Sequence, residues 1–138
     1  MNPEKFRSLL EPRPGWGSLA TFVPNKRLPV YNWLYFKEGF SRDLVFELAR
    51  LFRLKPGDKV LDPWCGSGTT VLACKEQGLD SLGCDLLPIA VLASRAKTGE
   101  YDTASLQEQA RQLFQVPFQK VSAPCPFARF FDRHLLED

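Results

Sequence analysis

The sequence lacks any apolar segment long enough to cross a membrane. Its longest apolar run, Leu86–Ala93, has eight residues and includes Pro88, whereas a spanning helix needs about 20. The first ten residues carry charge and contain no apolar run, so we expect no signal peptide. These absences predict a cytoplasmic protein without a membrane partner.

Histidine and cysteine are scarce, and their spacing does not suit a metal. The four cysteines form no CxxC pair, and His134 is the single histidine, so we expect no zinc or other metal site. Because a chain without an export signal stays in a reducing compartment, the thiols should be free. We expect Cys65 and Cys84 to be packing residues rather than nucleophiles.

The overall composition is that of an ordinary globular domain. The chain has 138 residues, of which 44% are hydrophobic and 25% charged. Residues 1–55 contain ten Lys and Arg against five Asp and Glu, whereas residues 56–138 contain eight against eleven. A basic N-terminal third is compatible with a nucleic-acid surface, although charge alone favours an ordinary solvated face.

Residues 1–34 are rich in residues that break helices and strands. Seven of the first 30 are proline or glycine: Pro3, Pro12, Pro14, Gly15, Gly17, Pro24 and Pro29. We therefore expect an N-terminal arm without regular secondary structure. Aromatic residues are spread through the arm as far as Phe40. We favour their burial against the domain, and the alternative is a surface that stacks on a cofactor or on bases.

Residues 35–115 alternate between helical and strand patterns, and a proline-broken tail follows over residues 116–138. Ser41 can cap a helix that has Asp43 in its first turn. Apolar residues at helical spacing should form its inner face: Leu44, Val45, Leu48, Leu51 and Phe52.

Two strands and three further helices should follow that first helix. We expect a buried strand over residues 59–62, a second strand over residues 81–85, and helices over residues 69–77, 89–97 and 104–114. The helix over residues 89–97 should pack through Leu87, Val91, Leu92 and Ala96, and a short helix is expected over residues 127–136. This alternation predicts an α/β fold with a parallel sheet and flanking helices.

The segment between the first strand and its helix has the character of a ligand-binding loop. Asp62 ends the strand, and Gly66 and Gly68 precede the helix. Glycines let a ligand approach the backbone, and a helix N-terminus offers free N–H groups. Asp85 ends the second strand, about where nucleotide-binding βαβ units place a ribose-binding acid.

Several ligand classes compete for this loop. The phosphate-loop pattern GxxxxGK[ST] is absent. A dinucleotide site would need glycine where Val71 stands, and Asp62 would repel a pyrophosphate. S-adenosylmethionine fits better, because Asp62 would attract its cationic end and Asp85 would accept hydrogen bonds from its ribose. A structural turn with capping acids and no ligand also stays open.

Three segments carry a resemblance to a known family: residues 37–41 (KEGFS), 62–70 (DPWCGSGTT) and 83–90 (GCDLLPIA). The second is similar to the DPFxGSGTT loop, with Trp64 in place of phenylalanine, and the third to G-x-D-x-x-P-x-A. Together they resemble the S-adenosyl-L-methionine-dependent DNA methyltransferases that modify N6 of adenine or N4 of cytosine. The resemblance covers about residues 35–97 and implies a Rossmann-like methyltransferase fold.

The resemblance also implies which residues bind the cofactor. Phe40, Ser41, Asp62 and the backbone of residues 66–68 would hold its methionine end, and Asp85 would hold the ribose. Leu86 and Leu87 would flank the adenine unless they belong to the core, with Trp64 as a further wall, and Ser41 caps a helix in either case. The implied set is Phe40, Ser41, Asp62, Pro63, Trp64, Gly66, Ser67, Gly68, Thr69, Asp85 and Leu86.

A second hallmark of that family, the tetrapeptide [DNS]PP[YFW], is missing, since Pro-Pro does not occur. In the family it binds the amino group of a flipped base, so no catalytic residue can be assigned. Two strands also make an incomplete sheet with an exposed edge. We expect the cofactor-binding part of a DNA methyltransferase, with the catalytic motif on a second chain or a missing half. An RNA-modifying relative and a non-catalytic binding subunit are the alternatives.

Overall fold

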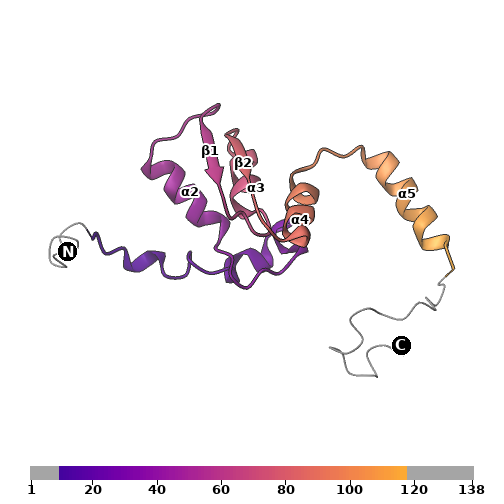
Figure 1. Ribbon diagram of the computed structural model, residues 1–138, viewed down its shortest axis with the longest axis horizontal. Coiled ribbons are helices and arrows are strands. Elements are labelled where there is room, and N and C mark those ends of the chain that lie inside the picture. Colours follow the sequence, from indigo (N-terminus) through magenta and orange to yellow (C-terminus); the bar gives the residue numbers. More distant parts are fainter. Residues whose placement is uncertain (1–9, 118–138) are drawn as a thin grey trace, which may run out of the picture. The chain divides into compact units, whose positions relative to one another are not determined.

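The computed structural model describes residues 10–117 (Figure 1). The chain forms two compact units, Met1–Glu100 and Tyr101–Asp138, which are described separately. The elements of the first unit are η1 (Pro14–Trp16), η2 (Val23–Arg27), η3 (Tyr31–Trp33), α2 (Arg42–Leu51), β1 (Lys59–Asp62), α3 (Thr69–Glu76), β2 (Asp80–Gly83) and α4 (Pro88–Thr98). Within residues 10–117, no helix is long and apolar enough to span a bilayer.

Strands β1 and β2 form a parallel pair, with Lys59 opposite Asp80 and Asp62 opposite Gly83. Helix α3 provides the crossover that parallel strands require, and it packs against both strands. This βαβ unit confirms the predicted fold class, a Rossmann-like parallel sheet with flanking helices, incomplete because the described residues contain two strands. Both strands end at the same edge, so the residues that follow Asp62 and Gly83 lie close together.

Within residues 10–100, helices cover one face of this sheet and leave the other bare. On the covered face, Val60 packs against a core formed by Val45, Ala49, Ala73, Cys74 and Leu79. On the opposite face, Leu61 and Leu82 are register partners and each is 63% exposed. The prediction of a buried strand over residues 59–62 is therefore wrong for this face, because no element of residues 10–100 covers it.

Helix α2 begins where the sequence predicts. The Ser41 hydroxyl oxygen accepts a hydrogen bond from the Leu44 amide at 3.3 Å, which is the expected N-cap. The helix packs on α3 through Val45 and Ala49, whereas Leu51 and Phe52 are 45% and 67% exposed. Their predicted burial is wrong because Leu51 lies off this stripe and Phe52 is the C-cap residue, beyond the last turn.

Helix α4 packs through small residues rather than through the expected leucines. Ala90 and Ser94 are buried, while Leu87 and Leu92 are 50% and 63% exposed. The prediction is wrong for these leucines because α4 lies very close to the turn that precedes α3. A Cβ atom added at Gly68 would come within 2.9 Å of the Ser94 Cα, and only small side chains permit that approach.

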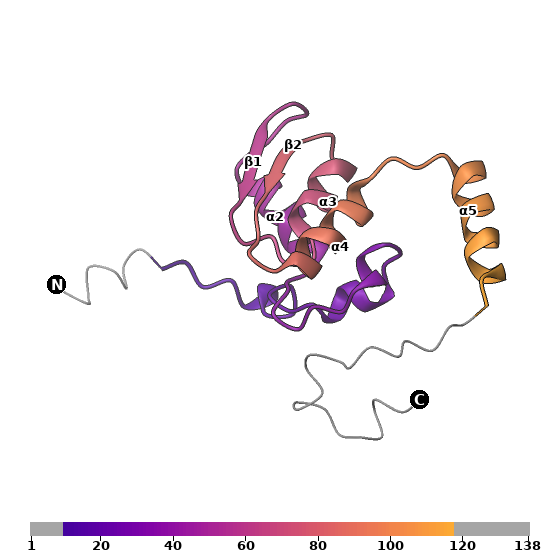
Figure 2. The same ribbon diagram turned by 45° about the vertical axis from the view of Figure 1, so that its right-hand side comes forward.

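The N-terminal arm contains three short 3-10 helices, η1, η2 and η3, rather than a fully irregular backbone. In Figure 2 it runs below α4 along one side of the helix layer. Phe22 and Tyr31 are buried, at 2% and 1% exposure, whereas Trp33 and Tyr35 are 60% and 55% exposed. The favoured interpretation, that the rings pack on the domain, is confirmed for the first two and wrong for the second two.

A buried lysine joins α4 to the arm. Lys97 is 5% exposed, and its Nζ donates a hydrogen bond to the Tyr31 carbonyl oxygen at 3.2 Å. No carboxylate of the described residues forms an ion pair with it. The loss of hydration on burial lowers the pKa of Lys97, because the interior disfavours an uncompensated charge.

We expect Lys97→Met to change the free energy of unfolding by no more than about 1 kcal/mol at pH 7, because the lost hydrogen bond offsets the removed desolvation. With a folded-state pKa below the ordinary lysine value of about 10.4, the folded chain binds fewer protons than the unfolded chain. Wild-type stability should therefore rise, relative to the variant, as pH increases from the lowered pKa toward 10.4. Urea unfolding of both proteins from pH 7 to pH 10.5 measures this, and parallel curves would contradict it.

The described part of the second unit is helix α5 (Thr103–Gln115). Asp102 caps it, since its Oδ2 accepts a hydrogen bond from the Ser105 amide at 3.0 Å. This confirms the predicted helix over residues 104–114. The short helix predicted over residues 127–136 lies outside the described residues.

Candidate functional site

The candidate site centres on residues 63–68, which join β1 to α3 and are here named the glycine loop. Asp62 organises this loop from its start. Its Oδ1 accepts a hydrogen bond from the Trp64 amide at 3.1 Å, and its Oδ2 accepts one from the Thr70 hydroxyl. The carboxylate therefore closes the loop onto the first turn of α3, where negative charge is favourable.

Asp85 holds the same loop from the turn that follows β2, because β2 ends at Gly83 and not at Asp85 as predicted. Its Oδ2 accepts a hydrogen bond from the Gly66 amide at 2.8 Å, and its Oδ1 accepts one from the Leu87 amide at 2.8 Å. These donors, Leu87 first and Gly66 second, lower the pKa of Asp85, because hydrogen bonds to the ionised form favour it. The carboxylate is thus charged at neutral pH, ties the loop to the start of α4, and keeps lone pairs for further donors.

Both glycines of the loop adopt left-handed backbone conformations, with φ of +50° at Gly66 and +84° at Gly68. Each also lies against a neighbouring residue. A Cβ atom at Gly66 would lie 3.0 Å from the Phe36 ring, and one at Gly68 would overlap Ser94. Phe36 is thus a site residue that the sequence reasoning missed. Its one sequence signal is its position just before the KEGFS segment.

Two large apolar side chains stand exposed beside the carboxylates. Trp64 and Leu86, on the turns that follow β1 and β2, are 79% and 95% exposed. The structure therefore excludes Leu86 from the core, which was one of its two interpretations. Pro63 is exposed as well. Exposed apolar surface next to a charged acceptor can bind a ligand that has a flat ring at one end and hydrogen-bond donors at the other.

The two carboxylates border different hollows. Asp85 and Leu86 border one of about 400 Å³, whose other lining residues are Pro88, Val91, Leu92 and Arg95. Asp62 lines an apolar hollow of about 270 Å³ next to Phe40, between α2 and β1. The strand ends themselves touch, since the Cys84 amide donates to the Asp62 carbonyl oxygen at 2.9 Å. Both carboxylates therefore accept hydrogen bonds from the glycine loop, and each borders a separate hollow.

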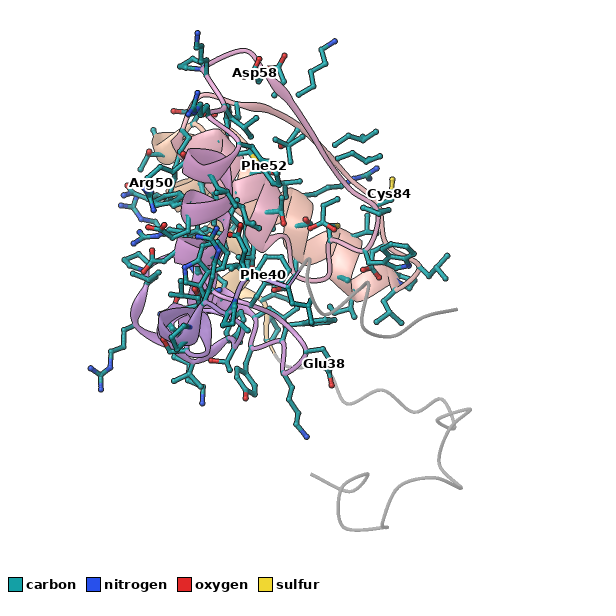
Figure 3. All side chains as sticks on the ribbon, turned by 90° about the vertical axis from the view of Figure 1, so that its left-hand side faces the viewer. Glu38, Phe40, Arg50, Phe52, Asp58 and Cys84 are labelled. Carbon is teal, nitrogen blue, oxygen red and sulfur yellow. The ribbon has the colours of Figure 1, made fainter. Side chains whose placement is uncertain are left out.

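The remaining predicted residues are Ser67, a buried residue of the loop itself, and residues that flank or pack near the loop. Ser67 and Thr69 are 3% and 5% exposed, and Ser41 is fully buried, its hydroxyl engaged as the α2 cap. Phe40 packs against the core, whereas Glu38, two residues earlier, points away from the molecule (Figure 3). These residues support the loop, while Pro63, Trp64, Asp85 and Leu86 form its accessible side.

The described cysteines are free thiols. Cys65 and Cys74 are buried, and burial raises the pKa of both thiols, which disfavours the reactive thiolate. Packing is therefore the correct interpretation for Cys65. It is wrong for Cys84, which is exposed and points outward in Figure 3, because β2 has no neighbour beyond it among residues 10–117.

The sequence of this chain is similar to those of known proteins. Residues 34–94 match a family model for DNA methylases of the N6/N4 type. The chain is 38% identical over 105 residues to the type II methyltransferase M.BsoBI of Geobacillus stearothermophilus, covering 75% of this chain and 21% of the relative. It is 39% identical over 71 residues to the type II methyltransferase M.AvaI of Nostoc sp., covering 51% of this chain and 15% of the relative. The chain thus spans about a fifth or less of the relatives' length.

A solved structure is also similar. It is described as a putative DNA modification methylase from Thermus thermophilus, complexed with S-adenosyl-L-methionine, and matches with a TM-score of 0.40 and 24% sequence identity. The match covers 67% of this chain and 40% of that one. The matched family segment contains all three motifs, with the strand, loop and helix that carry them. Over residues 34–94, this chain is therefore similar to the N6/N4 DNA methylases.

Proposed function

We propose that this chain is the S-adenosyl-L-methionine-binding part of a DNA methyltransferase that modifies an exocyclic amino group of adenine or cytosine. The observation that carries the proposal is the pair of hydrogen bonds by which Asp85 holds the glycine loop. That arrangement keeps a charged acceptor beside backbone amides at the carboxyl ends of parallel strands, where such sheets bind ligands. The match of residues 34–94 to the N6/N4 DNA methylase family model supports the same reaction.

The residues present suit this cofactor chemically. The ionised Asp85 has spare lone pairs for the two ribose hydroxyls, and the adjoining hollow of about 400 Å³ is within the usual range for small-ligand sites. Leu86 and Trp64 offer apolar surface to an adenine ring. The negative charge of Asp62, at the other side of the loop, favours a cationic amino-acid end.

When bound, S-adenosyl-L-methionine supplies an electrophilic methyl group. In this proposal, the chain's own residues bind and orient. Asp85 fixes the ribose, Leu86 and Trp64 flank the adenine, and the glycine loop with Asp62 holds the amino-acid end. Alignment of this kind accounts for much of the rate of a two-substrate displacement. The tetrapeptide that would bind the target amino group is not in this sequence, so the proposal assigns that contact to a further polypeptide segment.

We place that segment at the exposed face of the sheet and at the unpaired edge of β1. Leu61 and Leu82 are exposed together there, and the apolar hollow next to Phe40 lies beside the edge of β1 that carries no partner strand among residues 10–117. A further strand and helix could pair with this edge and cover the leucines. The much greater length of the relatives supports a large additional part, on this polypeptide or on a second one.

Two measurements test the proposal. Calorimetric titration of the purified chain with S-adenosyl-L-methionine is expected to give micromolar binding, and no binding would contradict it. Transfer of a radioactive methyl group to duplex DNA by the chain alone is expected to be negligible, and turnover would show that the catalytic groups are already present. Retention of RNA rather than DNA at physiological salt would favour the RNA-modifying alternative.

A further inference from the structure

One fully buried side chain of the arm joins three segments of the site. Asn25, in η2, has 0% exposure. Its Nδ2 donates a hydrogen bond to the Phe40 carbonyl oxygen at 2.9 Å and lies 3.4 Å from the Thr69 hydroxyl. Its Oδ1 accepts a hydrogen bond from the Arg42 amide at 2.8 Å. The arm is therefore tied both to the KEGFS segment and to the start of α3, directly after the glycine loop.

Two further contacts hold residues 39–42 against the N-terminal arm. The Ser41 amide donates to the Leu19 carbonyl oxygen of the arm at 2.9 Å. A Cβ atom at Gly39 would lie 2.9 Å from the Phe22 ring. Residues 39–42 are thus packed tightly between the arm and α3, and Asn25 supplies the polar contacts at the centre of that packing.

An amide side chain is the chemistry that this position needs. The Phe40 carbonyl requires a donor, whereas the Arg42 amide, one of the N-terminal α2 N–H groups without an intrahelical partner, requires an acceptor. Asparagine offers both at once without a charge. Aspartate would accept from Arg42 but would place an oxygen against the Phe40 carbonyl, leaving a buried group unpaired.

We propose that Asn25 is a positioning residue for the amino-acid end of the cofactor, acting through Phe40 and Thr69. The inference rests on the proposed function, and it extends the site to the N-terminal arm. Because Asn25 fixes the segment next to Asp62 and does not touch the hollow that Asp85 borders, its influence should be confined to one end of the ligand. Adenosine recognition by Asp85 should not depend on it.

The test compares two ligands on two variants of the full chain. Asn25→Asp changes the buried amide, and Asn32→Asp makes the same chemical change at an exposed arm position. Each protein is titrated calorimetrically with S-adenosyl-L-methionine and with 5′-methylthioadenosine, which has the adenosine and sulfur but no amino-acid end. We expect Asn25→Asp to weaken S-adenosyl-L-methionine binding about 10-fold or more and methylthioadenosine binding less than two-fold. Asn32→Asp should change neither.

Two outcomes would overturn the inference. One is unchanged S-adenosyl-L-methionine affinity in Asn25→Asp, and the other is an equal loss for both ligands, which a merely structural role would produce. A wild-type chain that binds neither ligand would instead refute the proposed function itself, and the inference with it.

If circular dichroism shows that Asn25→Asp is unfolded, Gly39→Ala provides the second test. Its new methyl group would press on the Phe22 ring and, at 3.0 Å, on the Phe36 carbonyl oxygen, displacing the same segment while the Asn25 amide stays in place. The same selective loss of S-adenosyl-L-methionine binding is expected. Equal affinity to wild type for that ligand in the folded variant would refute the positioning role.

Discussion

Asp85→Ala is expected to weaken binding of S-adenosyl-L-methionine roughly 100-fold, because charge-assisted hydrogen bonds are the strong ones in such sites. The variant loses the proposed acceptor for the ribose. It also releases the Gly66 and Leu87 amides, which the carboxylate now holds at 2.8 Å each, so the glycine loop and the start of α4 lose their common anchor. Calorimetric titration at constant salt and pH measures the change.

Asp80→Ala is the matched control for this prediction. Asp80 is an exposed aspartate at the start of β2, the strand that Asp85 follows, so its removal alters the net charge equally without touching the loop. Its affinity should stay within about two-fold of wild type. Asp85→Asn, which keeps one acceptor and the side-chain shape, should fall between the two. Equal binding by Asp85→Ala and wild type would remove Asp85 from the site.

The largest effect on folding is expected for Gly68→Ala, which should lower the free energy of unfolding by about 3 kcal/mol or more. Two costs combine there. The residue has φ of +84°, where a side chain is strained, and its Cβ atom would overlap Ser94 on α4. Urea unfolding followed by circular dichroism gives the value.

Gly57→Ala separates these two costs. Gly57 has φ of +90°, but a Cβ atom there would meet no atom within 4 Å. It should therefore lose only the backbone contribution, about 1 kcal/mol. The difference between the two variants measures the close packing of α4 on the glycine loop. Similar losses in both would mean that α4 moves aside without cost.

The bounds of the helices were predictable because local signals set them, whereas β2 (Asp80–Gly83) ends two residues before the predicted Asp85. Ser41 caps α2 through its own hydroxyl, Pro88 starts α4 where a missing N–H costs nothing, and Gly78 ends α3 with φ of +66°. The loop with Asp62 and Asp85 was equally visible, since strand ends and glycines are read from adjacent residues. Each of these features needs only a few neighbouring positions.

The buried faces were harder to predict because they depend on distant partners. Leu92 is more apolar than Ser94, yet Ser94 is the buried one, since α4 must approach Gly68. Leu61 is an apolar residue within a strand, which is typical of a core residue. It is exposed because no element of residues 10–100 covers its face of the sheet. Asn25 and Thr69 are 44 residues apart in the sequence, and no local pattern predicts their contact. Such features follow from the tertiary arrangement and not from propensity.

The order in which the elements pack bears on how this protein is made. Helix α3 contacts β1 and β2, which flank it in the chain, and α2 and α4, which each lie one element further away, so its main contacts span at most one intervening element. Short loops of this kind close quickly, and such a unit can acquire its structure while a ribosome is still adding residues. In such a folded unit Leu61 and Leu82 stand exposed on one face of the sheet, and exposed apolar surface of this kind favours association with other surfaces.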